Sequence, residues 1–170
     1  MKILRLISLL CLAFISSGIS FAQEWRGLKP LRSTRGDVEK LLGEPVQRSP
    51  ALYLLKDKSI LIGYAKISGC DDKELSSWNV PKDTVITIAV TFFPEHWVNL
   101  SELKLDLSKF EKFSDPEFAG LFSYVSNELG LKIATDDQVV SSIAYFPAKR
   151  NWHLMCHEGV PSKAIYRMGE

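Results

Sequence analysis

The sequence has 170 residues, of which 24% are charged, and its 21 Lys and Arg residues nearly balance its 20 Asp and Glu residues, for a formal net charge of +1. A chain so close to neutral has no overall field that would attract nucleic acid or an anionic membrane surface, so we expect neither partner. Hydrophobic residues make up 46% of a chain of ordinary single-domain length, which is enough to bury a core.

The N-terminus has the three regions of a secretory signal peptide. Lys2 and Arg5 precede an apolar run, Leu6 to Ile15. Small residues then precede an expected cleavage site after Ala22. The apolar run is short for a membrane span, although an uncleaved anchor is the alternative. We therefore predict a secreted or periplasmic protein in which residues 1–22 are removed. The mature chain, residues 23–170, is then one soluble domain without a membrane span.

A short helix is predicted within the stretch STRGDVEKLLGEP, residues 33–45. Thr34, with Asp37 three residues later, has the pattern of a weak capping box, and a glycine and a proline end the helix. Three apolar residues follow the cap at helical spacing: Val38, Leu41 and Leu42. Because so short a helix is not stable alone, we expect this face to be buried on a sheet. If Leu41 is fully buried there, Leu41→Ala would cost about 2–5 kcal/mol.

Most of the following chain has the pattern of strands. Leu52 to Leu55 and Ile60 to Ile67 flank a polar turn and predict a hairpin. A loop, Gly69 to Lys82, then precedes Thr84 to Phe93, which is rich in β-branched and aromatic residues and predicts a central strand. The stretch LSELKLDLSKF, residues 100–110, fits either a short helix or an alternating strand.

The segment from Phe118 to Leu129 is ambiguous, because its apolar residues fit both helical and strand spacing. We favour three strands over residues 122–146, since aromatic and β-branched residues crowd the first part and turn residues mark both breaks. Leu54 to Tyr64 and Ile133 to Tyr145 share a pattern of strand, Asp turn and strand, which suggests an internal duplication. The predicted fold class is α+β, with one or two short helices packed on a mostly antiparallel β-sheet.

Two resemblances rest on quoted stretches of the chain. The capped helix ending LLGEP and the hairpin after it, residues 34–67, resemble the opening of SmpA/OmlA-type small envelope domains, which implies an envelope location. That family's lipoprotein Cys is missing here, which argues against a role in an assembly complex. Over nearly the whole mature chain, EWRGLKPLRSTRGDVEKLLGEP, WNVPKDTVITIAV, LKLDLSKFEKFSDPE and SSIAYFPA are similar to a family of uncharacterised secreted bacterial proteins, a resemblance that implies no activity.

The sequence has few residues in patterns that support catalysis. It contains no glycine-rich phosphate loop, no GxSxG and no HExxH motif. The cluster HLMCH supplies His153, Cys156 and His157, which with Cys70 would make a tetrahedral zinc set, or a Cys nucleophile beside a His. Two His four residues apart suit a helix, whereas this tail has the pattern of a strand or coil. We favour a solvated tail, and a small hydrolase or metal-dependent enzyme remains the alternative function.

Two cysteines remain in the mature chain once Cys11 leaves with the signal peptide. In an oxidising compartment Cys70 and Cys156 are predicted to form a disulfide. Two free thiols, or the zinc set, are the alternatives. The bond would clamp the C-terminal strand and the Gly69 to Lys82 loop to the body of the domain.

The same loop contains the other candidate residues. Its acidic residues Asp71, Asp72 and Glu74 lack the ligand spacing of a calcium loop and favour a solvated turn. Trp78 and Asn79 either form an interaction loop or, for the Trp, seal the edge of the core. The sequence thus favours a non-enzymatic binding module without a cofactor, whose partner is another envelope or extracellular protein.

Overall fold

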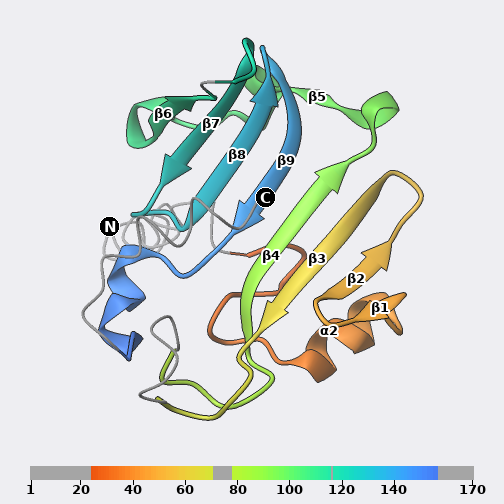
Figure 1. Cartoon of the computed structure of the whole chain (residues 1–170), viewed down its shortest axis with the longest axis vertical. Coiled ribbons are helices and arrows are strands. Elements are labelled where there is room, and N and C mark those ends of the chain that lie inside the picture. The colour runs from red at the N-terminus through yellow and green to blue at the C-terminus, as the bar shows by residue number, and fades with distance from the viewer. Residues whose placement is uncertain (1–23, 71–77, 116, 157–170) are drawn as a thin grey trace, which may run out of the picture.

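The computed structural model describes residues 24–70, 78–115 and 117–156 (Figure 1). Its elements are, in chain order, α2 (Arg35–Leu42), β1 (Gln47–Arg48), β2 (Ala51–Leu54), β3 (Lys58–Tyr64), β4 (Val85–Phe92), η1 (Pro94–His96), β5 (Val98–Asn99), η2 (Leu100–Leu103), η3 (Leu107–Lys109), β6 (Glu111–Ser114), β7 (Leu121–Ser126), β8 (Leu131–Asp136), β9 (Val139–Tyr145) and η4 (Lys149–Leu154), where η is a 3-10 helix. The predicted signal peptide and its cleavage site lie outside the described residues.

The strands form one antiparallel sheet in the order β1-β2-β3-β4-β9-β8-β7-β6, with β5 paired to β9. The long strand β4 pairs with β3 of the first hairpin on one side and with β9 on the other, and so links the hairpin to β9, β8, β7 and β6 (Figure 1). The predicted fold class, a few short helices on a mostly antiparallel sheet, is confirmed. Both segments of the suggested duplication form antiparallel hairpins, and the duplication itself stays a prediction.

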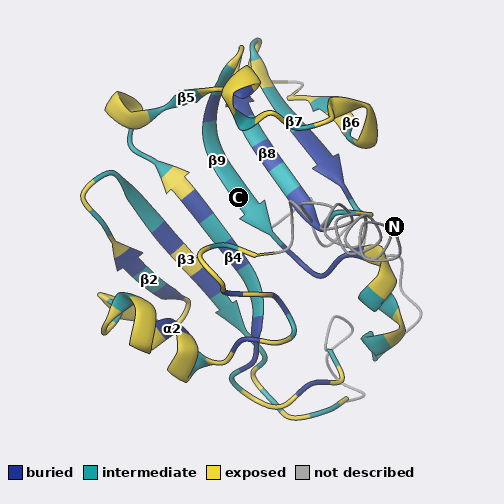
Figure 2. Cartoon of the chain, turned by 180° about the vertical axis from the view of Figure 1, so that it is seen from behind, coloured by how far each residue is buried: buried dark blue, intermediate teal, exposed yellow. Residues whose placement is uncertain are grey.

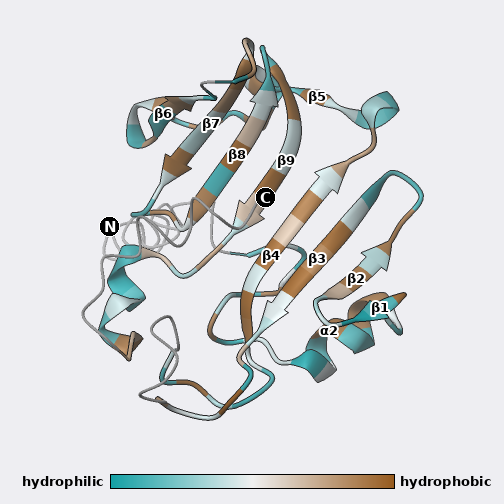
Figure 3. Ribbon diagram, viewed as in Figure 1, coloured by the Kyte–Doolittle hydropathy of each residue, from teal (hydrophilic) through white to brown (hydrophobic). Residues whose placement is uncertain are grey.

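The strand register places the apolar residues on one face of the sheet. One row of directly paired residues crosses the sheet from β2 to β7: Tyr53, Ile60, Val90, Ile143, Ile133 and Tyr124. Successive side chains of a strand point to opposite faces of the sheet. The buried residues therefore appear as separate bands along β3, β4 and β8 (Figure 2). Hydrophobic residues are concentrated on the strands, whereas α2 is mostly hydrophilic (Figure 3).

The core has two clusters of buried residues, one in each half of the sheet. The first contains Leu28, Val38, Ala51, Tyr53, Ile60, Ile62, Val85, Ile88 and Val90. The second contains Leu100, Tyr124, Leu131, Ile133 and Val140. The half-buried rings of Phe92 and Tyr145 pack against both clusters, so the apolar interior continues across the β4–β9 pairing.

The helix α2 has the predicted capping box but not the predicted buried face. The Thr34 hydroxyl accepts from the Asp37 amide at 3.3 Å, and the Asp37 carboxylate accepts from the Thr34 amide at 2.8 Å. Val38 is fully buried and Leu42 packs at the edge of the core, whereas Leu41 is 44% exposed. The expected burial of Leu41 was therefore wrong, because the contact of the helix with the sheet is too narrow to include that side chain. The cost expected for Leu41→Ala required full burial and does not apply to this exposed position.

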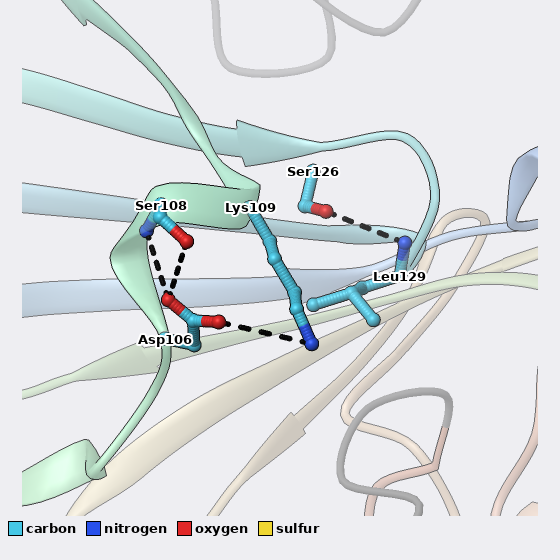
Figure 4. A network of polar contacts seen from close by, with 5 residues as sticks. All are labelled: Asp106, Ser108, Lys109, Ser126 and Leu129. Carbon is cyan, nitrogen blue, oxygen red and sulfur yellow. Dashed lines mark hydrogen bonds and ion pairs between the residues drawn. The ribbon is translucent and has the colours of Figure 1, made fainter.

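The two ambiguous segments resolve differently. Residues 121–126 are strand β7, so strands were the correct choice for the Phe118 to Leu129 region. Residues 100–110 form neither the short α-helix nor the strand that the sequence allowed. They contain the two 3-10 helices η2 and η3. Asp106 fixes η3 by accepting from the Ser108 amide and hydroxyl (Figure 4). These turns place Leu100 in the second core cluster.

No helix in the described part of the chain combines the length and the apolar character that a membrane span needs.

Candidate functional site

A disulfide joins Cys70 to Cys156, which are 86 positions apart in the sequence, and their Cα atoms are 5.2 Å apart. The predicted pairing is confirmed. Because both sulfurs are bonded to each other, neither is a thiolate that could bind zinc or act as a nucleophile. Among the described residues there is also no group of three or more His, Cys, Asp or Glu side chains that could hold a metal ion. Four of the candidate ligands for zinc or calcium lie outside the described residues: Asp71, Asp72, Glu74 and His157.

Backbone hydrogen bonds support the disulfide. Trp78 and Met155 form an isolated antiparallel bridge, and the Asn79 amide donates to the Leu154 carbonyl at 2.7 Å. On the other side of the loop, the Gly69 amide donates to the Val80 carbonyl at 2.9 Å. We call this region, residues 68–70, 78–82 and 149–156, the clamped corner. The tail folds there as the 3-10 helix η4 and not as the predicted strand or coil.

The clamped corner exposes polar side chains around half-buried apolar ones. Asn79 is exposed, whereas Trp78 is half-buried, so the two candidate residues of the predicted interaction loop differ in accessibility. Trp152 is half-buried, and its indole N–H is buried without a hydrogen-bond partner in the described part of the chain. His153 is exposed, and its Nδ1 atom lies 2.9 Å from the Arg150 carbonyl.

A second feature lies between the segment before α2 and the outer side of that helix. It is an open hollow of about 620 Å³, which we call the basic hollow, and its lining is Arg26, Gly27, Leu28, Lys29, Arg32, Ser33, Asp37, Lys40 and Leu41. Four of these side chains are cations and one is a carboxylate. The sequence prediction missed this site, although Arg26, Lys29 and Arg32 recur at every third position. That spacing is a weak signal, because only the fold shows that Lys40 faces the same hollow.

The N-terminus of α2 is fixed by an Arg–Asp pair under an aromatic ring. Arg35 donates from Nε and Nη2 to the Asp83 carboxylate at 3.0 and 2.9 Å, and its guanidinium lies 4.2 Å from the centre of the Tyr64 ring. The Arg35 amide also donates to the Asp83 carbonyl at 2.9 Å. Asp83 has a positive φ of 63°, so its carbonyl and its carboxylate both bind the same residue of the helix.

Burial raises the pKa of the Tyr64 phenol above its ordinary value of 10.0. The folded state therefore keeps the phenolic proton more tightly than the unfolded state, and the stability from this group is complete below about pH 10 and is lost as the pH rises further. Urea denaturation measures the free energy of unfolding at neutral and at strongly alkaline pH. We expect the decrease between the two pH values to be smaller for Tyr64→Phe than for the wild type. Equal losses in the two proteins would contradict this. The lysines titrate in both, so they cancel in the comparison.

The sequence matches no family model and no curated protein. The chain is similar to one solved structure, the crystal structure of a DUF4309 family protein (YjgB) from Bacillus subtilis subsp. subtilis str. 168. The sequence identity is 20%, the match covers 73% of this chain and 84% of that chain, and the TM-score is 0.47. The comparisons do not support the resemblance to SmpA/OmlA-type domains.

Proposed function

We propose that the protein is a non-catalytic binding module that acts outside the cytoplasm and contacts another envelope or extracellular protein through the clamped corner. The Cys70–Cys156 disulfide is the observation that most supports this proposal. Structural disulfides persist in periplasmic and extracellular compartments and are rare in the reducing cytosol. The bond thus agrees with the secretion signal predicted from the first 22 residues.

The clamped corner is pre-organised for binding. A loop that is ordered before it binds loses less conformational entropy on association, so more of its contact energy contributes to affinity. Here the disulfide, the Trp78–Met155 bridge and the Asn79–Leu154 hydrogen bond fix the described part of the loop. Trp and Met are enriched in protein–protein interfaces, and Trp78, Trp152 and Met155 are all half-buried at this corner.

Site-specific photocrosslinking in producing cells tests the proposal. A photoreactive phenylalanine derivative at Asn79 or Lys82 should give one discrete protein adduct, because both positions are exposed on the clamped corner. The same derivative at Lys56, an exposed position in the β2–β3 turn, is the matched control and should give none. Equal adducts at corner and control, or no adduct at either corner position, would overturn the proposed surface.

The non-catalytic part of the proposal has its own test. Purified protein should turn over no substrate in a broad hydrolase screen, with and without added zinc. Turnover that is abolished by a single substitution, His153→Ala for example, would overturn it and favour the small hydrolase or metal-dependent enzyme.

A further inference from the structure

The basic hollow and the clamped corner have no residue in common. Helix α2, beside the hollow, and η4 of the corner lie at opposite sides of the lower end of the sheet (Figure 1). We propose that the basic hollow is a second binding site, which takes an acidic peptide segment with carboxylate groups and an apolar side chain. The proposal does not depend on the function proposed for the corner.

The first argument is unbalanced charge. Arg26, Arg32 and Lys40 line the hollow, and within the described ranges none of them has a carboxylate partner at ion-pair distance. The whole chain has a formal net charge of only +1, so this local excess of cations is not a consequence of overall composition. A concave surface with a net excess of one sign of charge attracts a ligand of the opposite sign.

The carboxylates already present offset only part of the positive charge, because Asp37 and Glu24 stand against four cations. Asp37 is held by the helix cap, where hydrogen bonds from the Thr34 amide and then from its hydroxyl lower the pKa of the Asp37 carboxyl. Lys29 pairs with Glu24 at 2.6 Å, and both side chains are 46% exposed. Such an exposed pair contributes little stability, so a carboxylate of a ligand can replace Glu24 at small cost.

The second argument is a fixed backbone under the cations. Arg26 and Gly27 have φ values of 50° and 85°, and their tight turn closes the Trp25–Leu28 bridge through two hydrogen bonds of 2.9 Å. Further along, the Leu31 amide donates to the Val85 carbonyl at 2.7 Å, which ties the segment to β4. The hollow is therefore part of the folded domain, and its backbone needs no ordering on binding.

The third argument decides between a carboxylate-bearing peptide and a phosphate group. Leu41, 44% exposed, and the buried Leu28 give the hollow an apolar part, which an apolar side chain of a peptide would cover. A phosphate site usually uses free backbone N–H groups at a helix N-terminus. Here the Arg35 amide is already bonded to the Asp83 carbonyl and the Asp37 amide to the Thr34 hydroxyl.

Fluorescence anisotropy with a short labelled peptide of alternating glutamate and leucine tests the inference on the mature protein. The peptide should bind, binding should weaken with added salt, and a glutamine analogue should not bind.

The double variant Arg32→Glu, Lys40→Glu should weaken binding about tenfold or more. The control Lys56→Glu, Lys104→Glu reverses two equally exposed cations elsewhere and should change it little. Leu41→Asn should weaken binding while leaving the salt dependence unchanged.

Several results would overturn the inference. The first is no binding by the wild type, and the second is equal weakening by the two double variants. The third is displacement of the peptide by inorganic phosphate under conditions where sodium chloride of the same ionic strength leaves the peptide bound. Binding to phosphatidylglycerol vesicles in place of the peptide would identify a membrane surface instead. If the Arg32→Glu, Lys40→Glu variant fails to fold by circular dichroism, Arg32→Gln combined with Lys40→Gln tests the same two cations, with Lys56→Gln combined with Lys104→Gln as its control.

Discussion

Replacing Cys70 and Cys156 together with Ser should lower the free energy of unfolding by up to about 4 to 5 kcal/mol. The bond closes a loop across 86 residues, and in the chain-entropy model a cross-link of that span restricts the unfolded chain by about this amount. Strain and residual structure in the unfolded chain reduce the effect, so the figure is an upper one. The loss is the largest that we expect from changing one feature of the molecule.

Urea denaturation of the mature protein measures this effect. The wild type in a strong reductant should unfold at the same denaturant concentration as the double Ser variant, because both lack the cross-link. A variant as stable as the oxidised wild type would show that the corner is held by its backbone hydrogen bonds alone. In the photocrosslinking experiment the same variant should also lose the adduct at Asn79, since the described loop residues would no longer be fixed.

Ile62→Ala should lower the free energy of unfolding by about 2–5 kcal/mol. Ile62 is fully buried on β3, between Ala51 of β2 and Ile88 of β4 in the register of the sheet. Truncation removes buried methyl groups and leaves a cavity that the close-packed strands can fill only in part.

Leu61→Ala is the matched control for Ile62→Ala, because Leu61 is the adjacent residue on the opposite face of the same strand and is 38% exposed. It should cost clearly less, and thermal or urea denaturation distinguishes the two. Equal costs would contradict the assignment of the core to one face of the sheet.

Local signals in the sequence were sufficient for most of the elements. The Thr34 cap, the hairpin of β2 and β3, the strand β4 and the strands β7 to β9 were all predicted, with end points that differ by a few residues. Capping, turn residues and β-branched runs act over a few positions, so a single sequence contains them. The Cys70–Cys156 pairing was predictable for a different reason, because the predicted signal peptide contains Cys11 and leaves two cysteines that can pair in one way.

The tertiary structure decided what depends on residues far apart in the chain. Nothing local shows that β4 pairs with β9, that Leu41 faces solvent while Val38 is buried, or that Trp78 bridges to Met155. Likewise, Lys40 joins Arg26, Lys29 and Arg32 only because α2 packs beside the preceding segment. Local signals were thus enough for the helix cap, the longer strands and the disulfide, but not for the short strands or the 3-10 helices. Long-range strand pairing and the narrow contact of the helix set which side chains are left exposed, because burial depends on the sum of contacts from every neighbouring element.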